Sequence, residues 1–183
     1  ASSLVNKGFA SYAQSFKVSH TTSFLIQKFD YLENGQEEDF SVSIAGRVLA
    51  KRVMGKIAFF TISDQEGQIQ LYLDKRIINF NLEKQKLLSF EDLKEIVDIG
   101  DWIGVYGTIK KTNKGELSIK VEKWEMLSKS LQPLPDKWHG LTDIEKRYRQ
   151  RYLDLIVNPH SKNVFKTRAK CISFIRKWLD NRN

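Results

Sequence analysis

The stretch "GKIAFFTISDQEGQIQLYL", residues 55–73, decides how this chain folds. Apolar and polar residues alternate on both sides of Asp64-Gln65-Glu66-Gly67, a pattern typical of two strands joined by a tight turn. An aromatic residue, Phe59, and an amide, Gln70, stand where exposed strands usually carry Thr, Lys or Glu. The hairpin therefore raises the question of what these two side chains hold.

Strand alternation places Phe59 and Phe60 on opposite faces of the hairpin, so one of them belongs to the core. If Phe60 points inward, Phe59 must point outward. The residues alone leave this choice open, and they also leave Gln70 as an ordinary solvated strand residue. Gln68 is a rival amide on the same face as Gln70 and nearer the turn.

Three further segments alternate with the same period of two: "FSVSIAGRVLA" before the hairpin, then "DWIGVYGTIKK" and "ELSIKVEKWEML" after it. Residues 75–100 separate the third strand from the fourth. Within them, Ser89-Phe90-Glu91-Asp92 predicts a helix start and Gly100 a helix end. Five short strands with a helix in this place have the order of the OB-fold, a Greek-key barrel that binds oligonucleotides. Glycines 46, 104 and 107 fit the bends that close such a barrel.

Helices are predicted on both sides of the barrel, so the fold class is mainly β with helices. Residues 19–33 predict a short amphipathic helix with cap candidates Thr21 and Thr22. Near the other end, Pro133 and Pro135 indicate an extended linker. A capping box at residues 142–145, with Leu141 as its hydrophobic staple, opens a helix over "EKRYRQRYLDLIV". A last helix begins near Ser161 and carries a long apolar stripe.

These elements divide the chain into four predicted segments. They are a helical lead-in (1–38), the OB-fold domain (39–128), a linker with a hinge helix (129–160) and the start of another domain (161–183). The apolar stripe of the last segment has nothing after it in this sequence to cover it. We therefore expect a truncated domain there, or a surface for another chain, and self-association of the isolated chain.

Charge is distributed unevenly along the 183 residues. The net charge is +8, and residues 136–183 hold 12 Lys and Arg against 5 Asp and Glu, which leaves 18 against 17 for the rest. A polyanionic partner in the balanced part therefore needs a local basic cluster. The candidates are Arg47, Lys51, Arg52 and Lys56, joined later by Lys110, Lys111 and Lys114. On charge alone, a solvated edge of lysines is the favoured interpretation of this cluster.

Several function classes are excluded by the sequence. No apolar run approaches the roughly 20 residues of a membrane span, and the first residues lack a signal-peptide core, so we expect a soluble intracellular protein. Cys171, the single cysteine, lies among apolar helix positions and is predicted to be a buried structural thiol. His20, His139 and His160 lack metal-ligand spacing, so no metal site is expected from them.

The string "PLPDKWHGLTDIEKRYRQRYLDLI" closely resembles the hinge between the anticodon-binding and catalytic domains of bacterial and organellar class II lysyl-tRNA synthetases. The resemblance extends back through "GDWIGVYGTIKKTNKGELSIKVEKWEML" and "SVSIAGRVLAKRVMGKIAFFTISDQEGQIQLYL" to "YAQSFKVSHT". It therefore covers most of the chain from about Gly8. The last helix resembles the entry to the family's first signature motif, which forms a dimer interface in the whole enzyme. The chain stops before that motif's proline, and the ATP- and lysine-binding motifs are absent.

The resemblance implies the following activity and partners. The full-length enzyme would be a homodimer that activates lysine with ATP and Mg²⁺ through an adenylate and transfers it to tRNA(Lys). This fragment would hold no catalytic residue, metal or cofactor, and would bind the anticodon stem-loop. The implied location is the cytoplasm, or alternatively a plastid or mitochondrion.

The resemblance also assigns roles to residues of the hairpin. In this family and its aspartyl and asparaginyl relatives, a Phe stacks on the central anticodon uridine while an Arg and a Gln hydrogen-bond its edge. Matching the motifs gives these roles to Phe59, Arg52 and Gln70, and places Glu116 near the outer anticodon bases. For Glu116, a solvated turn carboxylate remains the alternative. Candidate contacts to the RNA backbone are Arg47, Lys51, Lys56 and Lys111, with an ion pair as the alternative for Arg47.

Three other hypotheses stay open at this point. A synthetase specific for aspartate or asparagine would share the central-uridine residues, and only the hinge string and the Glu116 loop favour lysine. A free-standing single-strand-binding module would use neither the hinge nor the last helix. A structural protein that dimerises through the last helix would bind RNA only incidentally.

Overall fold

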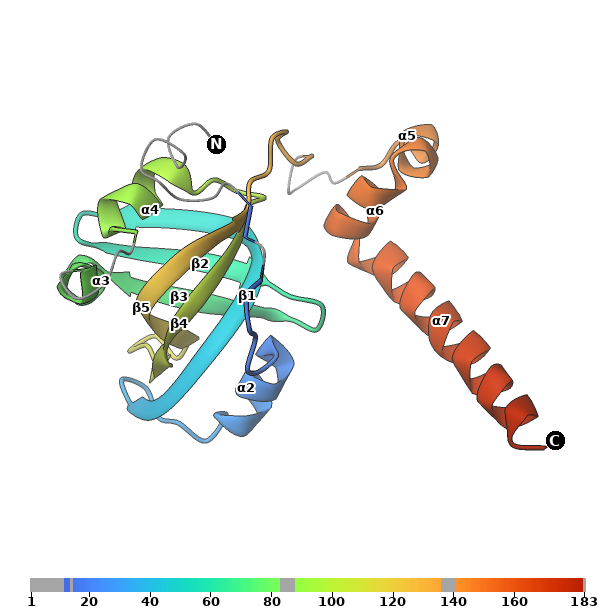
Figure 1. Ribbon diagram of the computed structural model, residues 1–183, viewed down its shortest axis with the longest axis horizontal. Coiled ribbons are helices and arrows are strands. Elements are labelled where there is room, and N and C mark those ends of the chain that lie inside the picture. Colours follow the sequence, from blue (N-terminus) through green and yellow to red (C-terminus); the bar gives the residue numbers. More distant parts are fainter. Residues whose placement is uncertain (1–11, 14, 83–87, 136–140, 183) are drawn as a thin grey trace. The chain divides into compact units, whose positions relative to one another are not determined.

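A computed structural model describes residues 12–13, 15–82, 88–135 and 141–182 of the chain (Figure 1). The chain divides into two compact units, Ala1–Leu131 and Gln132–Asn183. Residues 136–140 of the resembling hinge string, His139 and most of the segment before Phe16 lie outside the described residues. The two units are described separately.

The first unit is a closed five-stranded barrel. Its strands are β1 (Glu37–Met54), β2 (Ile57–Ser63), β3 (Gln68–Asp74), β4 (Trp102–Lys111) and β5 (Leu117–Ser128). They close in the order β1-β2-β3-β5-β4, with β3 and β5 parallel and the other neighbours antiparallel. The predicted five-stranded barrel is therefore confirmed. The four-segment division of the chain stays a prediction, although β1 and β5 begin and end close to its barrel boundaries.

Alternation along the strands builds the barrel core. Along β2, Ala58, Phe60 and Ile62 are fully buried while the residues between them are partly exposed. Gly107 of β4 serves the closure, because a Cβ there would lie 2.0 Å from the carbonyl oxygen of Lys120. A side chain at that position would separate β4 from β5.

Helix α2 (Thr22–Lys28) lies at one end of the barrel and is shorter than the predicted 19–33 segment. Its N-cap is Thr21, whose side chain accepts a hydrogen bond from the backbone N–H of Phe24. Leu25 and Phe29 are buried in the barrel core. The helix therefore packs against the barrel and contributes to its hydrophobic core.

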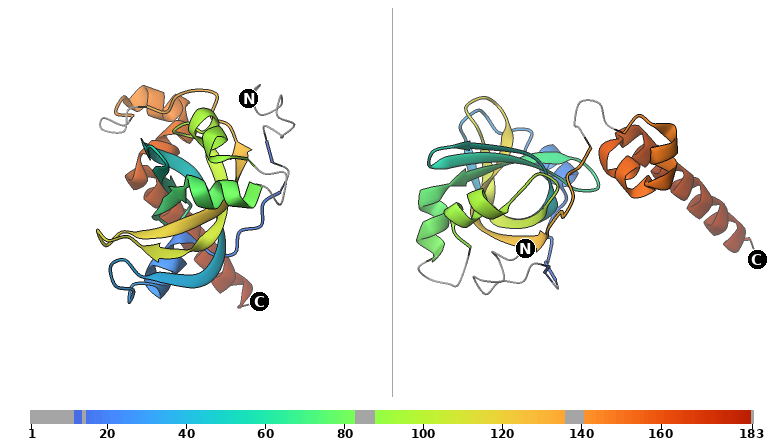
Figure 2. Two further views of the ribbon diagram at one scale, coloured as in Figure 1. Left: turned by 90° about the vertical axis from the view of Figure 1, so that its left-hand side faces the viewer. Right: turned by 90° about the horizontal axis from the view of Figure 1, so that it is seen from above.

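Two helices, not one, separate β3 from β4: α3 (Lys75–Leu82) and α4 (Phe90–Ile96), which lie against the barrel (Figures 1 and 2). The predicted start of α4 is confirmed, because Ser89 and Asp92 form a reciprocal capping box. Phe90 and Leu93 of α4 are buried. The Trp124 indole of β5 donates to the Ser89 carbonyl over 3.2 Å, which attaches the start of α4 to the barrel.

The second unit contains α5 (Ile144–Arg149), α6 (Arg151–Val157) and α7 (Pro159–Asp180). The single hinge helix predicted from residue 145 is wrong, because the backbone leaves helical geometry at Gln150 (φ −118°, ψ 58°). Asp143 is the N-cap, and its side chain accepts from the backbone N–H of Lys146 over 3.0 Å. The capping box predicted at residues 142–145 therefore starts one residue too early. Helix α7 begins at Pro159, whose fixed φ and missing N–H suit the first turn.

The second unit also corrects the prediction for Cys171, which is exposed. Every described residue of α7 from position 163 onward is exposed, so the described part of the unit does not cover this face of the helix. No helix in the described ranges is both long and apolar enough to cross a lipid bilayer. Among the same residues, no three His, Cys, Asp or Glu side chains are grouped to hold a metal ion.

Candidate nucleic-acid interface

Phe59 lies on the outer face of the barrel, because Phe60, its neighbour in β2, is fully buried. Cross-strand pairing puts Arg52 of β1 on one side of Phe59 and Tyr72 of β3 on the other. The rings of Phe59 and Tyr72 meet edge to face, with centroids 5.6 Å apart and planes at 67°. The outer face of β1, β2 and β3 therefore carries a guanidinium and two aromatic rings in one row.

Gln70 shares the outer face with this row, two residues before Tyr72 in β3. Its Oε1 accepts a hydrogen bond from the Ser118 hydroxyl of β5 over 2.9 Å. Among the described residues this is the one hydrogen bond of the Gln70 side chain, so the NH₂ group and a second lone pair remain for a ligand. Ser118 is buried, and sequence reasoning missed it. The signal was a serine among apolar residues at the start of β5.

Glu116 lies in the turn between β4 and β5, where it is exposed. Its backbone N–H donates to the Thr112 hydroxyl and its carbonyl accepts from the Thr112 N–H, which fixes the turn. A cavity of about 250 Å³ separates this turn from α2, and Gln68 and Lys111 also line it. The structure therefore brings Glu116 beside the rival amide Gln68. Ser118 contacts both the Gln70 side chain and the Glu116 carbonyl (3.2 Å).

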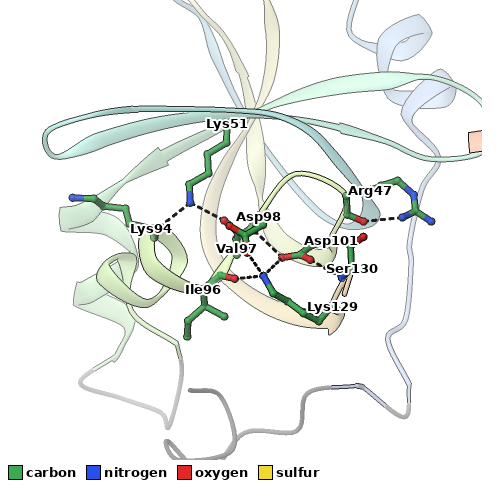
Figure 3. A network of polar contacts seen from close by, with 10 residues as sticks. Arg47, Lys51, Lys94, Ile96, Val97, Asp98, Asp101, Lys129 and Ser130 are labelled. Atoms are coloured by element: carbon green, nitrogen blue, oxygen red, sulfur yellow. Dashed lines mark hydrogen bonds and ion pairs between the residues drawn. The ribbon is translucent and has the colours of Figure 1, made fainter. Parts of the chain in front are cut away.

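The basic side chains predicted to contact the bases or the backbone of the RNA divide into two kinds. Arg52 and Lys56 are exposed at the β1–β2 turn. Lys51 instead donates to the carbonyls of residues 94 and 97 at the end of α4, over 2.7 and 2.6 Å, and burial lowers its pKa (Figure 3). Lys111 donates to the Leu32 carbonyl over 2.8 Å. The Lys51 ammonium therefore holds the end of α4, and the Lys111 ammonium holds the segment between α2 and β1.

Arg47 also contacts the protein. Its guanidinium donates to the Gly100 carbonyl over 2.7 Å and lies 5.4 Å from the centroid of the Trp102 ring. Burial lowers its pKa, and the nearby carboxylate of Asp101 acts in the opposite direction. The side chain thus fixes the loop that precedes β4.

A polar network beside Arg47 was also missed by sequence reasoning (Figure 3). The fully buried carboxylate of Asp101 accepts from the Lys129 ammonium and from the backbone N–H of Ser130, each over 2.7 Å. Burial opposes the charge of Lys129, but its hydrogen bonds to Asp101 and Asp98 prevail and raise its pKa. The network fixes the end of β5 against the loop before β4.

On the other side of Tyr72, three charged side chains form a second missed group. Glu37, the first residue of β1, receives a hydrogen bond from Lys110 over 2.6 Å and from Lys120 over 2.5 Å. These bonds, that from Lys110 foremost, hold the pKa of Glu37 below its usual range. The Lys110 ammonium lies 4.9 Å from the centroid of the Tyr72 ring. No single stretch of sequence shows this group, because its members come from three strands.

Comparison with known proteins agrees with this geometry. Residues 42–127 match a family model described as "OB-fold nucleic acid binding domain". The whole chain is 95% identical over 183 residues to a lysine–tRNA ligase of Prochlorococcus marinus (strain MIT 9301), and covers 36% of that protein. It is 81% identical to the same ligase of strain MIT 9515 and 54% identical to that of Synechococcus sp. (strain RCC307), covering 36% and 35% of them.

Over its whole length the chain matches the N-terminal region of lysyl-tRNA synthetases. It corresponds to the N-terminal region of these lysine–tRNA ligases and contains their OB-fold anticodon-binding domain. The chain spans about a third of the length of the relatives it matches. The aspartyl and asparaginyl alternatives lose their support, because the relatives given above are all lysine–tRNA ligases.

Proposed function

We propose that the barrel binds the anticodon stem-loop of tRNA(Lys), and that Arg52, Phe59 and Gln70 read its central uridine. The observation that carries the proposal is the outward Phe59 ring, with a guanidinium beside it in β1 and the Gln70 amide on the same face. Stacking of one base on an aromatic ring contributes about 1–3 kcal/mol and tolerates any base. The ring therefore supplies affinity, and the polar groups supply the choice of base.

Gln70 can distinguish uracil from cytosine by its donor and acceptor. A carboxamide complements the adjacent acceptor and N–H donor of uracil, whereas cytosine presents an acceptor in place of that donor. Since Ser118 already donates to Oε1, the amide is held in one orientation. A wrong base then leaves a polar group unpaired, which costs about 1–3 kcal/mol when the group is desolvated.

Other parts of the surface would contact the rest of the loop. We assign Glu116, together with the cavity it shares with Gln68, to the outer anticodon bases. The exposed Lys56 is the first candidate for a phosphate contact. Arg47, Lys51 and Lys111 would have to release backbone carbonyls before they could bind phosphate.

For the full-length protein we infer ligation of lysine to tRNA(Lys) in the cytoplasm, with ATP and Mg²⁺ and through an aminoacyl adenylate. We further infer a homodimer formed through α7, whose described face exposes large apolar side chains. They are Val164, Phe165, Ile172, Phe174, Ile175, Trp178 and Leu179. Sedimentation of the isolated chain as a monomer at all micromolar concentrations would contradict this interface.

The first experiment is fluorescence-anisotropy binding to an anticodon stem-loop with UUU, beside the same RNA with UCU, at one salt concentration. We expect at least tenfold tighter binding to UUU, which corresponds to about 1.4 kcal/mol. Gln70→Ala should remove this preference, and Gln68→Ala, the matched amide nearer the turn, should keep it. Equal affinity for both RNAs in the unaltered chain would instead indicate a general single-strand-binding surface.

A further inference from the structure

Two lysines on the outer barrel surface converge on one carboxylate beside the proposed base-reading residues. Each oxygen of Glu37 has its own partner, since Oε1 accepts from Lys110 and Oε2 accepts from Lys120. The N–O distances of 2.6 and 2.5 Å are those of charge-assisted hydrogen bonds. The two ammonium groups are therefore positioned for an anion with one charge and two oxygens.

A phosphodiester of RNA has the same charge and two non-bridging oxygens, so it matches what the two lysines hold in Glu37. The lysine side chains are the less exposed members of the group, at 22% and 28%, against 39% for Glu37. Glu37 is also the first residue of β1, and the pairing of β1 with β4 becomes irregular just after Glu38. The carboxylate is thus the member that can leave most easily.

The position of this group connects it with the proposed base site. The Lys110 ammonium is 4.9 Å from the centroid of the Tyr72 ring, which is 5.6 Å from the centroid of Phe59. Lys110, Lys120, Glu37 and Tyr72 line one cavity of about 720 Å³, which α3 borders with Phe80. A strand with one base on Phe59 would therefore have its sugar-phosphate backbone within reach of this cavity.

We propose that Lys110 and Lys120 bind one phosphodiester of the RNA, and that Glu37 occupies their site when no RNA is bound. The inference rests on the proposed function, since it places the phosphate on the strand whose base stacks on Phe59. RNA binding then exchanges an internal anion for an external one. The Glu37 carboxylate lowers the affinity for every RNA equally, because it competes with the phosphate backbone of the RNA for the two lysines and does not compete with a base.

The experiment measures anisotropy binding of Glu37→Gln and Lys120→Ala to both the UUU and UCU stem-loops at several salt concentrations. We expect Glu37→Gln to bind each RNA at least threefold more tightly and Lys120→Ala at least threefold more weakly. Lys120→Ala should also reduce the slope of log K against log salt by about 0.7–0.9. Lys110→Gln repeats the test if Lys120→Ala unfolds. Glu95→Gln, an exposed position on α4 with the same charge change, is the control and should change affinity less.

A scan with single methylphosphonate linkages in the RNA loop identifies the phosphate. At one position, the neutral linkage should weaken binding of the unaltered chain and have no effect on Lys120→Ala. The proposal is overturned if no position behaves in this way, or if Glu37→Gln lowers the melting temperature without tightening binding. That second result would mean that the bridge only holds the start of β1. If the unaltered chain shows no preference for UUU over UCU, only the proposed anticodon reading is overturned. The proposed phosphate site at Lys110 and Lys120 is tested separately, because it should affect the affinity for both RNAs equally.

Discussion

Among the residues that the structure describes, Ser118 is the one that hydrogen-bonds the side chain of Gln70 and so orients its amide. Its buried hydroxyl donates to Oε1 of Gln70, so it turns a flexible amide into one that presents its NH₂ group in a fixed direction. We predict that Ser118→Ala reduces the preference for UUU over UCU by about two- to tenfold, since a hydrogen bond contributes about 0.5–1.5 kcal/mol. Stem-loop anisotropy with both RNAs checks this.

Two controls distinguish a loss of Gln70 amide orientation from general damage to the barrel. Affinity for the UCU loop should stay within about twofold of the unaltered chain, because stacking on Phe59 is retained. Ser41→Ala, an exposed serine of β1, should leave the preference intact. An unchanged preference in Ser118→Ala would show that the amide is oriented by the RNA itself.

Among the elements, the hairpin and α2 are joined by Asp64. This turn residue accepts from the backbone N–H and the hydroxyl of Thr22, each over 2.7 Å, and from the N–H groups of Glu66 and Gly67. Partial burial alone would raise the pKa of Asp64. The hydrogen bonds from Thr22, Gly67 and Glu66 outweigh burial, and the pKa lies below its usual value. The carboxylate therefore fixes the turn and the first turn of the helix together.

We predict that Asp64→Asn lowers the free energy of unfolding at pH 7 by about 1–2 kcal/mol, the usual contribution of hydrogen bonds to a charged group or a cap. A carboxyl group whose pKa is depressed by folding stabilises above its unfolded pKa of about 3.9 and loses this contribution as pH falls further. The difference between the two proteins should therefore be constant from pH 7 to 5 and shrink below about pH 4. Urea unfolding across this range measures it, and a difference independent of pH would contradict the charge-based explanation.

Sequence patterns predicted the parts of the fold that depend on neighbours along the chain. Alternation gave the five strands, and Ser89 gave the start of α4. Phe60 is buried, so Phe59 faces outward, as alternation requires. Contacts between distant residues could not be predicted in this way. Lys51 was expected to contact RNA from its place in a basic cluster, whereas its ammonium group meets carbonyls 43 and 46 residues away.

The residues of the candidate site also divide into those that the sequence predicts and those that depend on contacts between distant strands. Strand alternation and the motif shared with the family predicted Arg52, Phe59 and Gln70 on the outer face of the barrel. Ser118 and Glu37 could not be found, because their roles arise only where β3 meets β5 and where β1 meets β4 and β5. The break at Gln150 was missed for a related reason: helix propensity does not register the polar contacts that Asp154 makes with α5 and α7.

For the whole molecule, the division into two units means that each should unfold by itself. The second unit is organised by Asp154, whose carboxylate is fully buried. It accepts from Arg147 over 2.8 Å, Arg151 over 2.5 Å and Asn158 over 2.7 Å, and from Ser161 over 3.1 Å. Burial opposes its charge, but these hydrogen bonds prevail and lower its pKa. One carboxylate thereby joins α5, α6 and the first turn of α7.

We predict that Asp154→Ala lowers the free energy of unfolding of this unit by about 2 kcal/mol or more, because two arginines lose their counter-ion. Breaking a fully buried ion pair costs roughly 3–5 kcal/mol, and the expected loss is smaller here because both guanidinium groups reach solvent. Hydrogen–deuterium exchange should accelerate across residues 144–162 and stay unchanged in the barrel. Asp154→Asn, which keeps the shape and one acceptor oxygen, should show a smaller effect. The UUU preference should persist in both variants, because the proposed reading residues belong to the other unit. Faster exchange in the barrel strands would mean that the two units unfold together, and that the hinge contributes to the stability of the RNA-binding surface.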